Sequence, residues 1–255
     1  MKRGTPWIWL WGLASLAVPA MAQVTESPQT IAPGHFLLKM DVVSVAVDQD
    51  APGGGHYTGV GVARTFVSAG LTSNLDVQVG AQLFLDQKFT SNGLADRSSG
   101  LSDIFFRTKY TFWRDEATYT EMAVMPYVKI PTGTDKARSK AWEGGLILPW
   151  ATKLVGDVEA RAMAEVDYLR NANDNGYDTN WYFSGAVSRD FFKTVGLYGE
   201  LTASKSSGGL PWAGTLGGGA TVRLSSFFWW DFAVYRGLSH GAAKWNPVAR
   251  LNWRF

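Results

Sequence analysis

The chain has 255 residues, 46% of them hydrophobic, and it contains no cysteine, which excludes disulfide bonds and thiolate chemistry. Basic and acidic residues number 24 and 22, and without Lys2 and Arg3 they balance at 22 each. A neutral chain lacks the basic surface that binds nucleic-acid phosphates, so we expect no nucleic-acid partner.

The first 22 residues have the order of a secretory signal peptide. Two basic residues precede an apolar run over 7–18, and Ala20-Met21-Ala22 fits a cleavage site before Gln23. The run is too short for a transmembrane helix, and no later stretch reaches the ~18 apolar residues that such a helix needs. We therefore predict an exported protein with a signal peptide over residues 1–22.

Residues 23–35 are polar, contain two prolines and show no periodicity. This pattern predicts neither a helix nor a strand. The segment is expected to be either a flexible periplasmic leader or a piece folded into a lumen, and both alternatives stay open.

Strand-like segments separated by turn-forming residues follow as far as the C-terminus. In the segment 157–169, the residues from Val158 to Tyr168 carry four charged side chains in one row and none in the other, so this strand needs water on its charged face. Residues 75–87 alternate almost as regularly, whereas glycine and mixed residues blur the first, second and tenth segments. Ten or fourteen strands also fit. About twelve strands are predicted, at 36–47, 57–68, 75–87, 101–113, 117–130, 142–151, 157–169, 180–190, 195–205, 212–224, 228–238 and 245–255.

The connections between these segments alternate in length. Short ones such as 114–116 and 191–194 are assigned to the periplasm, and longer ones rich in Gly, Asn and Asp, such as 88–100 and 170–179, to the outside. This alternation is typical of outer-membrane barrels, which have an even number of strands and both termini in the periplasm.

The last eleven residues, 245–255, place apolar side chains with aromatic ends in one row and polar or cationic side chains in the other. A tilted strand of this length crosses a bilayer. The terminal Phe255 resembles the C-terminal signature of Gram-negative outer-membrane barrels, which the barrel-assembly machinery recognises. The alternative, an edge strand of a soluble sandwich, does not need tryptophan at both ends of its apolar face.

Nine of the 12 tryptophans follow residue 22, and each falls within about two residues of a predicted strand end. Indole prefers the headgroup level of a bilayer, where its body is in an apolar medium and its N–H is hydrated. The predicted membrane-interface residues are Trp113, Trp142, Trp150, Trp181, Trp212, Trp230, Trp245, Trp253 and Phe255.

Neither a catalytic nor a metal-binding constellation is apparent. His35, His56 and His240 do not have the spacing of a ligand set, and adjacent residues such as Ser239 and His240 point to opposite faces of a strand. The glycine runs at 53–55 and 217–219 lack the lysine and the strand–loop–helix setting of a phosphate-binding loop, and we interpret them as a loop and as close strand packing. We expect no enzymatic activity, no metal and no cofactor.

Charged side chains follow the polar rows of the predicted strands. A charge on the lipid face would cost a few kcal/mol near the bilayer centre, so these residues are expected to face the lumen. They could form ion pairs that fill a narrow barrel, or line a wetted passage whose opposed charges select solutes. Twelve strands lie between filled barrels of about eight and open channels of about sixteen, so we expect a narrow or partly plugged pore. The predicted lumen-lining residues are Asp76, Asp86, Asp103, Arg107, Lys109, Glu121, Lys129, Glu159, Arg161, Glu165, Asp167, Glu200, Arg223, Asp231, Arg250 and Arg254.

Two prolines, Pro126 and Pro149, fall within neighbouring predicted strands, where each removes one hydrogen bond from the ladder. The favoured interpretation is a local bulge. The alternative is a loosened wall through which a hydrophobic solute leaves sideways into the lipid.

A family pattern covers about 35 residues. It comprises Ser99-Gly100-Leu101-Ser102-Asp103, Lys109-Tyr110, Pro126 and Lys129-Ile130-Pro131-Thr132-Gly133. Together these resemble the motifs of the outer-membrane barrel family labelled as meta-pathway phenol-degradation or transporter proteins, which usually has glycine where this chain has Ser102. The resemblance implies a barrel that passes aromatic or other hydrophobic compounds, and it transfers no catalytic residues.

We therefore predict an all-β, transmembrane, antiparallel up-and-down β-barrel over residues 36–255, in the outer membrane of a Gram-negative bacterium. The expected function is a passive channel for small molecules, aromatic or hydrophobic compounds among them. The competing hypothesis is a structural or interaction barrel with an ion-paired, closed lumen and outer loops that bind a ligand or partner. Solute identity and oligomeric state stay open.

Overall fold

A computed structural model describes residues 24–255 except 52–54, 92–93, 135–136, 140 and 172. The predicted signal peptide over residues 1–22 lies outside the described residues. Within them the secondary structure is entirely β, so this part of the chain has no apolar helix of membrane-spanning length.

All thirteen strands belong to one sheet and pair with antiparallel neighbours. They are β1 (Phe36–Ala51), β2 (Gly55–Thr72), β3 (Leu75–Ser91), β4 (Leu94–Gly100), β5 (Ile104–Asp115), β6 (Thr120–Ile130), β7 (Glu143–Lys153), β8 (Val158–Arg170), β9 (Tyr177–Asp190), β10 (Val195–Ser206), β11 (Ala213–Arg223), β12 (Phe228–Gly237) and β13 (Trp245–Arg254).

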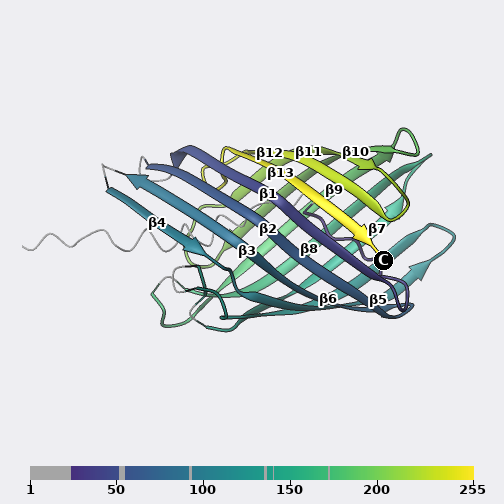
Figure 1. The fold of residues 1–255 in the computed structure, drawn as a ribbon, viewed down its shortest axis with the longest axis horizontal. Helices are drawn as coiled ribbons and strands as arrows, with labels where there is room; N and C mark the ends of the chain where they lie inside the picture. Colours follow the sequence, from purple (N-terminus) through teal and green to yellow (C-terminus); the bar gives the residue numbers. More distant parts are fainter. Residues whose placement is uncertain (1–23, 52–54, 92–93, 135–136, 140, 172) are drawn as a thin grey trace, which may run out of the picture.

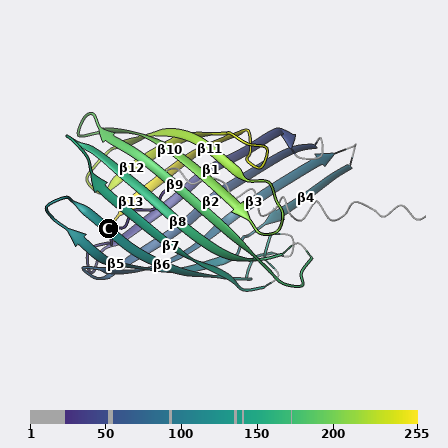
Figure 2. The same cartoon turned by 180° about the vertical axis from the view of Figure 1, so that it is seen from behind.

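The sheet closes into a barrel because β1 pairs with both β2 and β13. At the seam, Phe36 and Phe255 exchange two backbone hydrogen bonds, and their rings stack with centroids 5.5 Å apart. Every strand except β4 belongs to this closed wall, so the predicted up-and-down barrel of twelve strands is confirmed (Figures 1 and 2). We call the end at which β13 finishes the C-terminal end and the opposite end the distal end.

The prediction that residues 88–100 form a loop is wrong, because β3 continues to Ser91 and turns back as β4. This hairpin extends the wall at the distal end (Figure 1). Arg97 on β4 holds both carboxylate oxygens of Asp86 on β3, at 2.7 and 2.9 Å. Asp86, predicted to face the lumen, is therefore paired within the hairpin.

Part of the way along β1, β2 and β3, the inward-facing side chains switch between odd-numbered and even-numbered residues, which we call a parity change. In β1 the change lies between Asp41 and Val43, where the register shifts, and in β2 it lies at Ala63, whose φ is +52°. In β3 the nearly perfect alternation predicted for 75–87 fails near the end of that segment, because the adjacent Leu83 and Phe84 are both exposed. Beyond it, Phe89 packs inside against the Ala46–Tyr57 cluster. A bulge reverses the faces of the residues that follow it, which explains the blurred alternation in the first two strands.

The outer wall is apolar, whereas much of the interior is polar. Leucine, valine and phenylalanine side chains are exposed along the outward rows of most strands; Leu83, for example, is 60% exposed. Inside, two tyrosines from β10 and β12 pack with Val248, and Met125, Ile147 and Met163 form a second cluster. An apolar surface of this extent requires a lipid or detergent environment.

Glycines in β11 make room for two of the inner rings. A Cβ at Gly217 would collide with the ring of Tyr235, and one at Gly219 with Tyr198. The two tyrosines therefore lie against bare backbone, which is the close packing that the sequence suggested for this run.

Candidate functional site

Charged side chains gather inside the barrel. The predicted lumen residues that are buried there are Asp76, Asp103, Arg107, Lys109, Asp167, Glu200, Asp231 and Arg250. Those that are partly exposed along the same inward rows are Glu121, Lys129, Glu159, Arg161 and Glu165. Two others lie at the C-terminal end: Arg223 pairs with Asp190 at 2.9 Å, and the guanidinium of Arg254 lies 5.6 Å from the ring of Trp229.

Several charged residues of the interior were missed by the sequence reasoning, among them Asp48 on β1 and Arg64 on β2 as well as the four that follow. Lys39 and Asp41 lie on β1, whose parity change hides its inward row, and Glu143 is the first residue of β7. Glu26 lies in the aperiodic leader, so no alternation could assign it. One feature of the sequence could have indicated its position. Glu26 is a carboxylate in a polar, proline-containing segment, and the predicted lumen beside it contains cations with which it could pair.

The described part of the leader, residues 24–34, runs through the interior of the barrel. Near the C-terminal end, Gly34 N donates to Gly70 O at 3.1 Å, and a Cβ at Gly70 would collide with the carbonyl oxygens of Ile31 and Ala32. Further in, Ile31 N donates to Asp76, and the carbonyl of Gln29 accepts from Lys109 at 3.0 Å. The irregular backbone of this segment has no neighbouring strand to pair with, so side chains of the barrel strands provide hydrogen-bond partners for it.

Glu26 is the charged centre of this segment and is only 6% exposed. Its carboxylate oxygens lie 3.2 Å from Arg107 Nη1 and 3.5 Å from Lys39 Nζ. Burial alone would raise the pKa of Glu26, but Lys39, Arg107, Lys109 and Arg250 together hold that pKa well below its usual range. Glu26 is therefore an ionised carboxylate enclosed by cations.

A second carboxylate, Glu200 on β10, receives the tip of the segment. Val24 N and Thr25 N donate to it at 2.9 and 2.5 Å, and the hydroxyls of Thr25 and Tyr235 donate to it as well. The Thr25 hydroxyl also lies 2.8 Å from Ser184 Oγ. Four donors bind one buried carboxylate, so the N-terminal end of the described leader is firmly anchored to Glu200.

Two more carboxylates are fixed by neutral donors across strands. Asp167 accepts from Tyr127 Oη at 2.5 Å and from Asn180 Nδ2 at 3.1 Å. Asp231 accepts from Thr221 and Asn252, at 2.5 and 2.7 Å. These bonds tie β6, β8 and β9 together on one side of the interior and β11, β12 and β13 on the other.

The family motif forms a clamp at the distal end, which we call the Asp103 clamp. Asp103 accepts from Gly133 N at 2.9 Å and from both N and Oγ of Ser139, at 2.7 and 2.6 Å. Thr134 N donates to Leu101 O at 3.0 Å, so the two halves of the motif, around 99–104 and 129–134, hold each other. Lys129 bridges Asp103 and Glu143 beneath them.

The predicted interface aromatics lie on the outward rows or at the ends of strands. Trp150 and Trp230 are partly exposed, and the exposed members of the set are Trp113, Trp142, Trp181, Trp212, Trp245, Trp253 and Phe255. Trp230 stacks on Phe232 at 5.8 Å, and Trp253 packs on Phe255 at 5.1 Å. The histidines form no relay with Ser239, which donates instead to Trp212 O at 2.9 Å.

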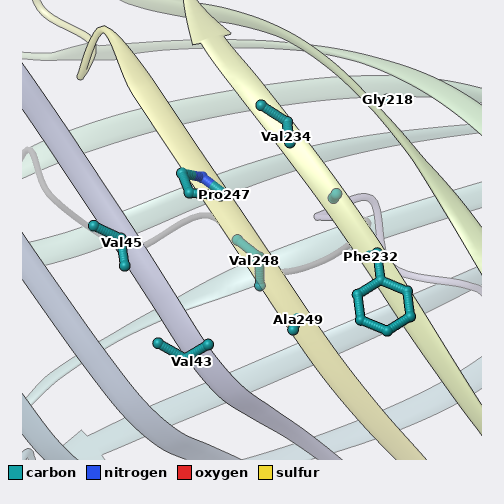
Figure 3. Close-up of a pocket in the computed structure, with 9 residues that line it drawn as sticks. Val43, Val45, Gly218, Phe232, Val234, Pro247, Val248 and Ala249 are labelled. Atoms are coloured by element: carbon teal, nitrogen blue, oxygen red, sulfur yellow. The ribbon is translucent and has the colours of Figure 1, made fainter.

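A shallow apolar groove crosses the outer wall over β1, β13 and β12. Its rim is formed by Val43 and Val45 on one side and Phe232 and Val234 on the other, with Pro247 at its floor (Figure 3). All five side chains face outward, and small residues on β11 and β13 deepen it. The groove is therefore a feature of the lipid-facing wall and does not open into the interior.

Comparisons with known proteins agree with this geometry. A family model described as "Putative MetA-pathway of phenol degradation" matches residues 22–255. No curated protein matches the sequence. Among solved structures, the COG4313 outer membrane channel from Pseudomonas putida F1 superposes with a TM-score of 0.72 at 12% identity, over 89% of this chain and 97% of that one.

Other outer-membrane barrels superpose less well. The β domain of the Bordetella autotransporter BrkA gives a TM-score of 0.55 at 15% identity, over 86% of this chain and 98% of that one. The KdgM porin in complex with disordered oligogalacturonate gives 0.51 at 10% identity, over 87% and 98%. At these identities the superpositions establish the fold of an outer-membrane barrel.

Proposed function

The chain belongs to the family described as "Putative MetA-pathway of phenol degradation", and from this premise we propose that it is an outer-membrane channel for passive passage of small molecules. Aromatic or hydrophobic compounds are the proposed solutes. The observation that carries the proposal is a closed barrel of twelve strands whose apolar outside encloses a charged interior. A chain built only as a wall would not need this many charges in its lumen.

The same proposal orients the protein in the membrane. The short connections and the paired ends of β1 and β13 share one end, so we propose that this end faces the periplasm together with the C-terminus. Val24, the first described residue of the leader, lies inside the barrel on Glu200. The exposed tryptophans would then lie at the two bilayer interfaces, where indole is favoured. Phe255, at the end of β13, is the expected contact of the barrel-assembly machinery, and lipid and a small solute are the remaining partners.

The specific observation that favours the alternative is the filled interior. Residues 24–34 and the ion pairs around Glu26 occupy the lumen, as a structural or interaction barrel would require. Ser239 donates to the backbone of Trp212, and within the described ranges no cluster of His, Cys, Asp and Glu could hold a metal ion. The two functions that we weigh are a channel and a closed scaffold.

Conductance distinguishes the two functions. Refolded mature protein in a planar lipid bilayer is expected to give discrete current steps, and strains carrying the gene should take up aromatic compounds faster than deletion strains. Unboiled protein should run faster than boiled protein on a detergent gel, which serves as the control for a folded barrel. A folded barrel with flat current traces and no effect on uptake would favour the closed scaffold.

The gaps beside Pro126 and Pro149 fit the favoured local bulge and also the alternative, a wall loosened for the sideways exit of apolar solutes. The β5–β6 ladder runs from Arg107↔Tyr127 directly to Tyr110↔Val124, and the β6–β7 ladder also lacks pairs beside Pro149. Both sides of β6 are thus missing hydrogen bonds at mid-strand.

Replacing both prolines with valine should close the ladders and slow the uptake of an apolar aromatic compound severalfold, with ion conductance unchanged. The control is Pro211→Val, a substitution in the loop between β10 and β11. If the double variant takes up the compound at the wild-type rate, sideways exit is contradicted, and the two prolines only form a local bulge.

A further inference from the structure

The cations around Glu26 have more donor capacity than Glu26 uses. Arg107 and Arg250 are 8% and 4% exposed, yet Arg107 Nε and Arg250 Nη2 have no hydrogen-bond partner. Arg250 uses its Nε on Asp41 at 2.7 Å, and Arg107 reaches Glu26 through Nη1. Glu26 Oε1, 3.2 Å from Arg107 Nη1, also lacks a hydrogen-bond partner, so Glu26 satisfies these cations incompletely. A carboxylate placed to accept from the unpartnered donors would bind there more favourably.

Aromatic and thioether groups border the same cations. The guanidinium of Arg107 lies 3.9 Å from the ring centroid of Phe66, whose ring is 6.1 Å from that of Phe105. On the other side, Met163 Sδ accepts from Glu26 N at 3.5 Å. An anion held by Arg107 would therefore have its body against apolar and aromatic surfaces.

The charges also limit what anion fits. Asp41 and Asp76 are buried nearby and oppose a second negative charge. Glu26 itself is a singly charged carboxylate on a short apolar stem. Its place among Arg107, Lys39, Lys109 and Arg250 therefore defines a monoanion site more closely than a phosphate site.

We propose that the cations around Glu26 form a solute-binding site for a small carboxylate with an aromatic body, and that Glu26 occupies this site as an intramolecular stand-in. The proposal deepens the channel function, on which its biological meaning rests. The leader holds the site closed, and a solute carboxylate competes with Glu26 for Arg107. Anionic aromatic compounds are then the solutes that the lumen selects.

Binding of benzoate to the full mature chain in detergent tests the site without requiring transport. By titration calorimetry, Glu26→Gln should bind benzoate about tenfold more tightly than the wild type, because one charge-assisted competitor is removed. Benzyl alcohol, which has the same ring without the charge, should show no such gain. Glu116→Gln, the same substitution in an exposed turn, should behave as the wild type.

Two further variants keep the test decisive. Deletion of residues 24–33 vacates the site without altering the wall and should also raise benzoate affinity, whereas Arg107→Met in either background should abolish the gain. Equal benzoate affinity in the wild type, Glu26→Gln and the deletion would overturn the proposal, as would an equal gain for benzyl alcohol. If the protein binds benzoate but shows no conductance, the channel function is overturned and the binding site stands. If it conducts but does not bind benzoate, the binding site is overturned and the channel function stands.

Discussion

Deleting residues 24–33 is expected to raise the single-channel conductance severalfold. The segment passes through the interior, where its backbone and side chains bond Asp76, Lys109, Thr111 and Glu200. Its removal leaves the twelve paired strands intact and replaces a strand's width of polypeptide with water. Planar-bilayer recordings of the deletion variant beside the wild type measure the effect directly.

The control for this deletion keeps the length of the segment. Substituting Gly and Ser throughout 24–33 removes the side-chain anchors but not the polypeptide, so we expect frequent brief openings in place of a stable larger current. Identical conductance in the wild type, the deletion and the Gly/Ser variant would show that the leader does not obstruct the pore.

Asp41→Ala is expected to destabilise the barrel by about 3–5 kcal/mol, because it leaves Arg250 as a buried cation without its closest partner. The pair joins β1 to β13 at the seam, with Arg250 Nε 2.7 Å from Asp41 Oδ1 and side-chain exposures of 5% and 3%. Urea-induced unfolding in lipid vesicles, followed by tryptophan fluorescence, gives the free energy of unfolding.

A double variant tests whether the loss comes from the orphaned charge. Asp41→Ala combined with Arg250→Met should recover most of the stability, since it removes both charges and retains an apolar side chain. Arg114→Ala breaks a pair with Glu121 in which the arginine is 41% exposed, and it should cost only about 0–1 kcal/mol. A loss below about 1 kcal/mol for Asp41→Ala would mean that Arg250 is neutralised by other carboxylates.

Alternation of polar and apolar residues predicted the wall wherever a strand keeps one parity throughout. The segment predicted at 157–169 is β8, Val158–Arg170, and its buried Met163 and Asp167 lie in the row that carries the charges. Parity changes defeat this reasoning. Ala63 adopts a left-handed φ although nothing in its residue type favours one, and the ladders to both neighbouring strands skip it while pairing Val62 and Arg64 on either side.

The interior was predictable in composition but not in pairing. Period-two spacing can place Arg107 and Arg250 on inward rows, yet it cannot say that both lie near Glu26, which is separated from them by 81 and 224 positions. The leader carries no periodic pattern, so its path depends on tertiary hydrogen bonds alone. To predict which charged side chains pair, one must know how the strands are arranged around the closed barrel. A single sequence does not contain that arrangement.

The Asp103 clamp changes what the shared signature means. Asp103, Gly133 and the backbone of Leu101 and Thr134 bind one another at the distal end and do not touch the leader or Glu26. The motif residues at 99–103 and 129–133 therefore build the distal end of the barrel, whereas a third part of the motif, Lys109, bonds the leader inside it. Solute preference within the family should accordingly be sought at the positions that correspond to Lys39, Arg107 and Arg250, which lie outside the motif.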